Sequence, residues 1–321
     1  YVLEPETEFI KQYSRGTVKD VYDNIEDDLE EGLDLVDGSF YNNSGKYHFT
    51  PNAALAFASR YYLFKGDWDN CIKYSSEMLG ADPSVYVKDI SALLAQTANA
   101  EDFIRTYTSP IDPSNLLVMR NITNFPVNVA YWPDQPLFFG IFNNNPWDAD
   151  DIRVSAEYPL YQRGDNGLAQ AKYEFLFERS SLTSDVGLYY TIVSAFRGEE
   201  VLLNRAESYV YKNNLTAALA DLQIYVSKRY DGNPPLTLQI LKSFYGSNSN
   251  QFVVLSFILD ERQKEFMHEG LRWFDIRRYE IPVDHVLENG SQITLEEEDD
   301  RKVLQLPQSA LDVGGLEPNP R

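Results

Sequence analysis

The stretch from Tyr131 to Arg153 reads YWPDQPLFFGIFNNNPWDADDIR and places aromatic rings close to amides, carboxylates and a guanidinium. The apolar C–H face of a sugar ring packs on aromatic side chains, and its hydroxyls pair with planar polar groups. The sequence therefore predicts a glycan-binding surface here. The candidate ligand-binding residues are Tyr131, Trp132, Trp147, Asn143, Asn144, Asn145, Asp148 and Arg153. The alternative, that these rings form a satellite core of a large loop region, stays open.

Two further groups have weaker chemistry. The loop SFYNNSGKY, residues 39–47, offers rings and amides but no tryptophan. Asp148, Asp150 and Asp151 could hold calcium, but the segment lacks the glycine and the distal glutamate of an EF-hand. We therefore predict no metal and no cofactor.

The sequence contains few of the residues that common catalytic motifs require. Its three histidines are His48, His268 and His285. HEGLR resembles the start of a zinc-protease motif, but the position four after His268 is Arg272, which cannot ligate zinc. No G-x-S-x-G, phosphate-binding loop or dinucleotide fingerprint is present. The sequence therefore predicts a protein that is not an enzyme.

Composition narrows the possible partners. The chain has 321 residues and a formal net charge of −21, which repels nucleic acid and anionic lipid surfaces. Cys71 is the only cysteine, so no intrachain disulfide forms, and its helical context predicts a buried core position. The sequence contains no long apolar run typical of a membrane span. It begins at Tyr1 without Met, as expected of a processed or truncated product.

Helical signals dominate the two ends of the chain. Thr17 and Asp20 form a capping box ahead of an amphipathic helix. FTPNAALAFASRYYLFKG and the following WDNCIKYSSEML predict a helical hairpin that turns at Gly66. ESYVYKNNLTAAL, 147 positions after RYYLFKGDWDNCI, repeats the pattern and aligns Asn213 with Gly66. Such pairs bury one another's faces when they stack, as tetratricopeptide-type repeats do.

A large insertion separates the two hairpins. Residues 81–196 are rich in Pro and Asn and contain short alternating runs such as KYEFLFER, which predict loops and brief strands. We therefore expect a mostly α protein with about seven helices, tetratricopeptide-like helical hairpins and a loop-rich insertion containing short β-strands. The expected single domain, residues 1–321, has four segments: 17–80, 81–196, 197–280 and 281–321.

The segment ERQKEFMHEGLRWFDIRRY, Glu261 to Tyr279, predicts one continuous helix. Glu265 and Glu269 lie on one stripe with two flanking arginines, which suits salt bridging better than proton donation. A glycine inside a helix costs about 1 kcal/mol relative to alanine. Gly270 therefore predicts a second backbone or a bulky ring pressed against the helix, and the segment is interpreted as structural.

Four segments together resemble the SusD/RagB family. They are LDERQKEFMHEGLRWFDIRRYE, VLLNRAESYVYKNNLTAALADLQ, the hairpin AALAFASRYYLFKGDWDNCIKYSSEML and the end piece LQLPQSALDVGGLEPNPR. The resemblance implies a protein lipid-anchored at the outer face of the Gram-negative outer membrane. Such a protein captures glycans or other nutrients and acts as a lid on a SusC-like TonB-dependent transporter.

The chain departs from this family in one respect. Members open with a lipoprotein signal, an acylated cysteine and further helices, and none of these is found here. The lipid anchor is therefore expected outside this chain, and the N-terminal part of the family is expected to be missing.

Two other hypotheses stay open. A helical-repeat scaffold that binds peptide or protein predicts a packed, dry insertion. An α-helical glycoside hydrolase needs two carboxylates on either side of a sugar bond, and about seven helices are too few for its twelve-helix barrel.

Overall fold

The computed structural model describes residues 2, 5–7, 13–41, 45–123, 132–163, 167–287 and 289–321. Within these ranges the chain forms twelve α-helices and three small antiparallel sheets, so the predicted mostly α fold is confirmed. The count of about seven helices was too low, and the argument it gave against a helical barrel therefore lapses. The chain divides into two compact units, residues 35–265 and residues 1–34 with 266–321.

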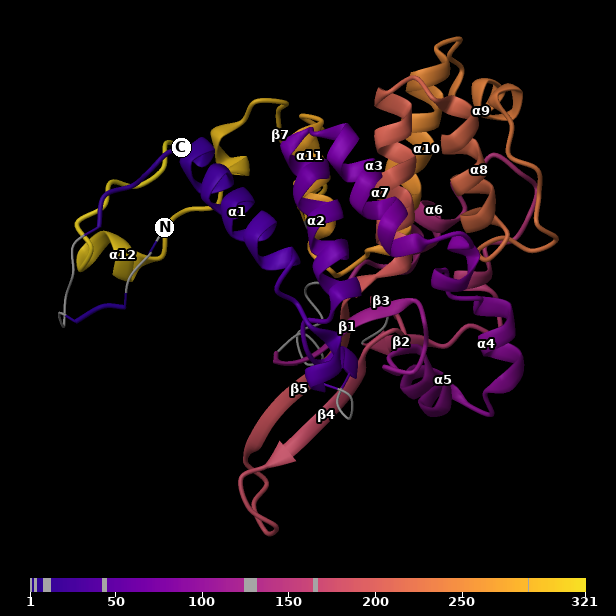
Figure 1. Ribbon diagram of the computed structural model, residues 1–321. Helices are drawn as coiled ribbons and strands as arrows, with labels where there is room; N and C mark the ends of the chain where they lie inside the picture. The colour runs from indigo at the N-terminus through magenta and orange to yellow at the C-terminus, as the bar shows by residue number, and fades with distance from the viewer. Residues whose placement is uncertain are drawn as a thin grey trace. The chain divides into compact units, whose positions relative to one another are not determined.

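The predicted helical hairpins form the helical layer of unit 35–265 (Figure 1). Helices α2 (Pro51–Lys65) and α3 (Trp68–Leu79) make the first hairpin. Helices α7 (Gly198–Tyr211) and α8 (Leu215–Val226) make the second, and α3 packs against α7. Helices α9 (Leu238–Tyr245) and α10 (Asn250–Glu265) follow, with α10 packed on α7, α8 and α9.

The two hairpins turn in the same way, as their aligned sequences predict. Gly66 and Asn213 both have left-handed backbones, with φ of 79° and 55°. The next residue caps the second helix in each case: Asp67 accepts from the Asn70 amide, and Asn214 accepts from that of Ala217. Glycine and asparagine tolerate positive φ better than other residues, so the turn is encoded locally in both repeats.

Small residues bring these helices together. The hydroxyls of Ser59 and Ser75 lie 2.8 Å apart, and the Asn204 amide donates to the Ser59 hydroxyl at 3.1 Å. Cys71 is fully buried beside them, as predicted, and burial raises the pKa of its thiol to about 11. The thiol is therefore a packing group.

The insertion contains more regular structure than its sequence predicts. Its helices are α4 (Ile90–Gln96), α5 (Ala100–Tyr107) and α6 (Gln135–Phe142). Its strands are β1 (Asn115–Ile122), β2 (Leu160–Arg163), β3 (Gly167–Gln170), β4 (Glu174–Arg179) and β5 (Gly187–Arg197). Strands β1, β5 and β4 form a three-stranded sheet in that order, and β2 pairs with β3.

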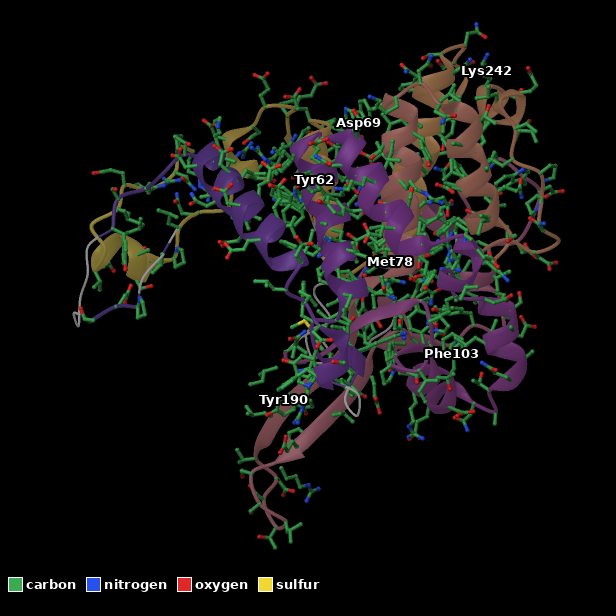
Figure 2. All side chains as sticks on the ribbon, in the orientation of Figure 1. Tyr62, Asp69, Met78, Phe103, Tyr190 and Lys242 are labelled. Atoms are coloured by element: carbon green, nitrogen blue, oxygen red, sulfur yellow. The ribbon has the colours of Figure 1, made fainter. Side chains whose placement is uncertain are left out.

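The insertion has its own small core and a projecting hairpin. Phe103, labelled in Figure 2, is 1% exposed and meets Tyr158 edge-on with ring centres 5.0 Å apart. The hairpin of β4 and β5 extends beyond the helices of this unit and carries Tyr190 (Figure 2). Apolar side chains near its end, Leu182 and Leu188, are 99% and 50% exposed.

The second unit begins with α1 (Val18–Leu33), whose capping box of Thr17 and Asp20 is formed as predicted. It also holds α11 (Leu271–Arg278), the hairpin of β6 (Val283–Val286) and β7 (Gln292–Leu295), and α12 (Gln308–Asp312). None of the helices in the described part of the chain combines the length and apolar character needed to cross a bilayer.

The prediction of one helix from Glu261 to Tyr279 is wrong. Helix α10 ends at Glu265 and α11 begins at Leu271, because His268 and Gly270 adopt left-handed backbones with φ of 66° and 79°. No atom lies within 4 Å of the position that a Cβ on Gly270 would occupy. The glycine serves the turn through its conformation, and no neighbouring backbone presses on it.

Candidate functional site

The structure separates the eight predicted ligand-binding residues. Tyr131 lies outside the described residues. Trp132 and Arg153 are buried, at 7% and 2% exposure, and neither lines a pocket described below. The other five lie on a loop that begins at the end of α6; Trp147 and Asn145 are half-buried, and the exposed members are Asn143, Asn144 and Asp148.

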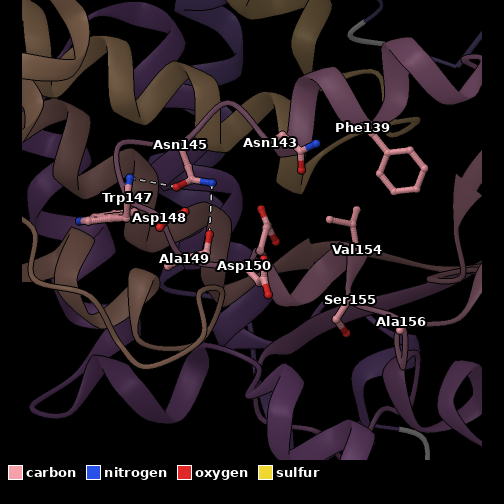
Figure 3. Close-up of a pocket in the computed structure, with 11 residues that line it drawn as sticks. Phe139, Asn143, Asn145, Trp147, Asp148, Ala149, Asp150, Val154, Ser155 and Ala156 are labelled. Carbon is pink, nitrogen blue, oxygen red and sulfur yellow. Dashed lines mark hydrogen bonds between the residues drawn. The ribbon is translucent and has the colours of Figure 1, made fainter.

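This loop borders an open pocket of about 440 Å³. Figure 3 shows Asn145 and Trp147 on one side of it, Phe139 and Val154 on the other, and Asp150 between them. The wall is lined by Phe139, Asn143, Asn145, Trp147, Asp148, Ala149, Asp150, Asp151, Val154, Ser155 and Ala156. The pocket is therefore mostly polar, and the half-buried Phe139 adds an aromatic side chain to its wall.

Helix α6 positions Phe139 and Asn143. Asp134 caps the helix by accepting from the Leu137 amide at 3.0 Å, and Phe138 and Phe142 are fully buried. A helix that buries those two positions presents Phe139 on another side. The helix ends at its C-cap residue Asn143, whose backbone N–H donates to the Phe139 carbonyl at 2.8 Å.

The loop after α6 is folded by its own amides. The Asn145 side chain accepts from the Trp147 amide at 3.0 Å and donates to the Ala149 carbonyl at 3.4 Å. Lys264 of α10 donates to the Asn144 carbonyl at 2.7 Å. These bonds fix the loop conformation before any ligand arrives, which reduces the entropy lost on binding.

Trp147 fastens this loop to the helices. Its indole N–H donates to the Pro235 carbonyl at 2.9 Å, and its ring meets Tyr230 and Phe257 edge-on at 5.0 and 5.7 Å. In Figure 3 the indole points away from Asp150. Trp147 therefore contributes an edge to the pocket, and most of its ring packs against the protein.

The far end of the loop is held by a buried ion network. Arg153 makes a two-pronged contact with Asp151 at 2.8 and 2.6 Å and reaches Glu261 of α10 at 2.8 Å. Glu265 accepts from Arg229 at 2.8 Å and from Arg197 at 2.7 Å. The network includes the cations Arg153, Arg197, Arg229 and Lys264 and the carboxylates Asp151, Glu199, Glu261 and Glu265. The buried Lys172 ammonium also donates to the Glu265 carbonyl at 2.8 Å.

The two glutamates of this network are ionised structural groups. Burial alone raises the pKa of Glu265, but Arg229 and Arg197 outweigh it and hold that pKa well below its usual range. Burial also opposes the ionisation of Glu261, and Lys264 and Arg153 overcome it and lower its pKa. Glu265 is 3% exposed and Glu261 is fully buried, so neither reaches a ligand.

Within residues 261–279, hereafter the signature segment, the salt bridging predicted for Glu265 is present, and three of its partners lie outside the segment. Glu265 pairs with arginines 36 to 112 residues away, and its bonds come from Arg229, Arg197 and Arg153. The network joins α10 to the pocket loop and to α7. The signature residues of α10 are therefore buried supports of the pocket.

Sequence reasoning missed Phe139, Val154, Ser155 and Ala156. A helical reading of QPLFFGIF could have found the first, because Phe139 and Asn143 are four residues apart and lie near one face. The other three follow Arg153 and gave no signal.

The weaker candidates gave no metal site. In the described ranges, no three His, Cys, Asp or Glu side chains come together in a way that could hold a metal ion. In the loop 39–47, residues 42–44 lie outside the described residues, and Tyr41 stacks on His48 with ring centres 4.1 Å apart.

Two family profiles match parts of the chain. Residues 1–63 match a SusD-like family described as starch-binding and associating with the outer membrane, and residues 179–309 match the SusD family that includes RagB. No curated protein matches the chain.

Solved structures share the fold. A SusD superfamily protein from Bacteroides thetaiotaomicron is 20% identical with a TM-score of 0.64, and the match covers 97% of this chain and 68% of that one. A SusD-like carbohydrate-binding protein from Bacteroides vulgatus is 20% identical with a TM-score of 0.54, covering 87% and 57%. A laminarin-binding SusD-like protein is 16% identical with a TM-score of 0.56, covering 94% and 69%. The chain thus spans between 57% and 69% of these three proteins.

Proposed function

The chain belongs to the SusD/RagB family, and we propose that it is a non-catalytic glycan-binding protein that holds its ligand in the pocket between Phe139 and Ala156. One observation carries this proposal. The predicted aromatic and amide loop borders an open pocket of about 440 Å³, in which a ring, two amides and two exposed carboxylates converge.

The pocket has the chemistry that a sugar requires. Asn143 and Asn145 offer amide oxygens and N–H groups, and Asp148 and Asp150 offer acceptors for hydroxyls. Phe139 and Val154 supply apolar surface for a C–H face. The volume lies within the range of small-molecule sites, about 300–1,000 Å³. Two solved structures of this fold are described as binding carbohydrate and laminarin, which supports the same class of ligand.

The absence of catalysis is part of the proposal. A glycosidase needs a carboxyl group that can donate a proton beside the scissile bond. Glu261 and Glu265 are buried and held ionised by cations, so they are unsuited to that role.

The wider role of the protein also belongs to this proposal. We infer that it lies at the outer face of the outer membrane and is held there by a lipid anchor. There it passes glycan to a SusC-like TonB-dependent transporter. The family description of residues 1–63, which names starch binding and the outer membrane, supports this role.

Affinity electrophoresis through gels that contain neutral polysaccharides, laminarin among them, tests the binding. We expect wild-type retention, and about fivefold weaker retention of Asn143→Ala and Asp148→Asn, since each loses a hydrogen bond to the ligand worth about 1 kcal/mol. Both side chains are exposed, so the melting temperature stays unchanged. Asn248→Ala, an exposed asparagine outside the pocket, is the matched control.

Each other outcome selects a rival. Reducing ends released from the retained polysaccharide point to the hydrolase. A chain that no glycan retards, but that binds a peptide library, points to the helical-repeat scaffold. If the Asn248→Ala control loses retention to the same extent, the glycan does not bind in this pocket.

A further inference from the structure

A second pocket lies beside the first and shares two lining residues with it. Asp150 and Ser155 line both, and the neighbouring pocket, of about 460 Å³, has walls from α4 and from residues 150–157 and 231. Its remaining lining residues are Ser91, Leu94, Ala95, Ile152, Glu157 and Asp231. These two adjoining pockets are hereafter called the Asp150 groove.

The floor of the Asp150 groove is a fixed backbone ladder. The Asp231 amide donates to the Asp150 carbonyl at 3.0 Å, and the Ile152 amide donates to the Arg229 carbonyl at 2.9 Å. Arg229 is in turn fully buried in the ion network. The carboxylates on this floor are therefore carried by segments that the fold holds in place.

Every charged side chain that lines the Asp150 groove is acidic. Asp151 is neutralised by Arg153, which contacts it at 2.6 Å. The remaining four, Asp148, Asp150, Glu157 and Asp231, are exposed. Among the described residues that line the groove, none is Lys, Arg or His. A concave wall of one sign concentrates its potential inside the groove.

We propose that the Asp150 groove binds neutral or amine-bearing glycan chains and rejects polyanionic ones, such as uronate-rich or sulfated glycans. The proposal rests on the glycan-binding function proposed above. A carboxylate on the ligand meets up to four like charges and no cation among the described lining residues, whereas the hydroxyls of a neutral sugar find four acceptors there. An ammonium group on the sugar adds attraction to the same carboxylates.

The test compares three forms of one glycan backbone. The neutral glycan that the chain retains is compared with its C6-carboxylated form and with its 6-amino-6-deoxy form by titration calorimetry in 20 mM NaCl. We expect the carboxylated form to bind at least tenfold more weakly than the neutral form, and the amine form at least as tightly. In 300 mM NaCl the difference shrinks, because salt screens exposed charges.

Matched variants separate the groove from the general charge of the chain. Asp150→Asn and the pair Glu157→Gln with Asp231→Asn should each reduce the discrimination severalfold. Asp185→Asn removes an almost fully exposed carboxylate from the β4–β5 turn, outside the groove, and should leave it unchanged. If all variants act alike, the discrimination comes from the net charge of −21, and the proposal is overturned.

The remaining outcomes are also decisive. Carboxylated glycan that binds as tightly as the neutral form, or better, overturns the acidic selection but leaves glycan binding intact. If Asp150→Asn reduces the discrimination and the Glu157 and Asp231 pair does not, the selection is limited to the first pocket. That result overturns the proposal that both pockets act together. Failure of all three forms to bind refutes the proposed function itself.

Discussion

Replacing Glu265 by glutamine removes one charge from the centre of the buried network while preserving the side-chain volume. The carboxylate accepts from Arg229 at 2.8 and 3.2 Å, from Arg197 at 2.7 Å and from the Tyr225 hydroxyl at 2.8 Å. A glutamine removes the negative charge that these arginines contact. Its side-chain NH₂ group also donates hydrogen bonds, so it would face the N–H donors of the arginines.

The expected loss of stability is large. Breaking a buried ion pair by removing one partner costs about 3–5 kcal/mol, because an uncompensated charge remains in the interior. The substitution removes one negative charge from a buried site that Arg229, Arg197 and Arg153 contact. With a urea slope of about 2–3 kcal/mol per molar, the unfolding midpoint should fall by about 1–2 M.

Tryptophan fluorescence during urea unfolding measures this loss. A Trp273→Phe background confines the signal to unit 35–265, whose tryptophans are Trp68, Trp132 and Trp147. The exposed Glu77 of α3 provides the matched control, and its change to glutamine should stay within about 0.5 kcal/mol. A Glu265→Gln loss as small as that of the control would refute the view that this network holds the unit together.

Three further predictions follow from individual residues. Because the pKa of Glu265 is depressed in the folded state, its contribution to stability is complete above the usual glutamate pKa, about 4.3, and is lost as the pH falls further. The free energy of unfolding should therefore be lower at pH 3 than at pH 5, and Glu265→Gln should make this difference smaller. Gly198→Ala should destabilise the fold by about 1–3 kcal/mol, because a Cβ there would lie 2.1 Å from the Tyr86 carbonyl oxygen. Gly140 is a helical glycine with open space around its Cβ position, so Gly140→Ala should stabilise the fold by about 0.5–1 kcal/mol in the same urea assay. Asn213→Gly should leave the melting temperature equal or higher, since φ is 55° there, and a fall of several degrees would contradict the local origin of that turn.

The sequence identified the elements whose signals lie within a few residues of one another. The capping box of Thr17 and the shared turn at Gly66 and Asn213 both formed as predicted. Each depends on hydrogen bonds and dihedral preferences between near neighbours, so a single sequence contains the information. The same reasoning failed at Gly270, because propensity does not tell a glycine inside a helix from one that ends it.

The sequence pointed to the loop that borders the pocket, but it did not predict the positions of the side chains on that loop. Trp132 and Trp147 have the same chemistry and similar flanking residues, yet the first is buried and the second fastens the loop through Pro235. The burial of a side chain depends on which distant segments pack on it, and the local sequence does not specify those segments.

The sequence alone determined the helical hairpins, their turns and the segment that supplies amides, rings and carboxylates, because those features arise from contacts along the chain. Only the tertiary structure decided that Glu265 pairs with Arg153, Arg197 and Arg229, up to 112 residues away, and that Phe139 faces a pocket. Charges pair across the interior according to which elements meet there, and that choice is made by packing of the whole unit.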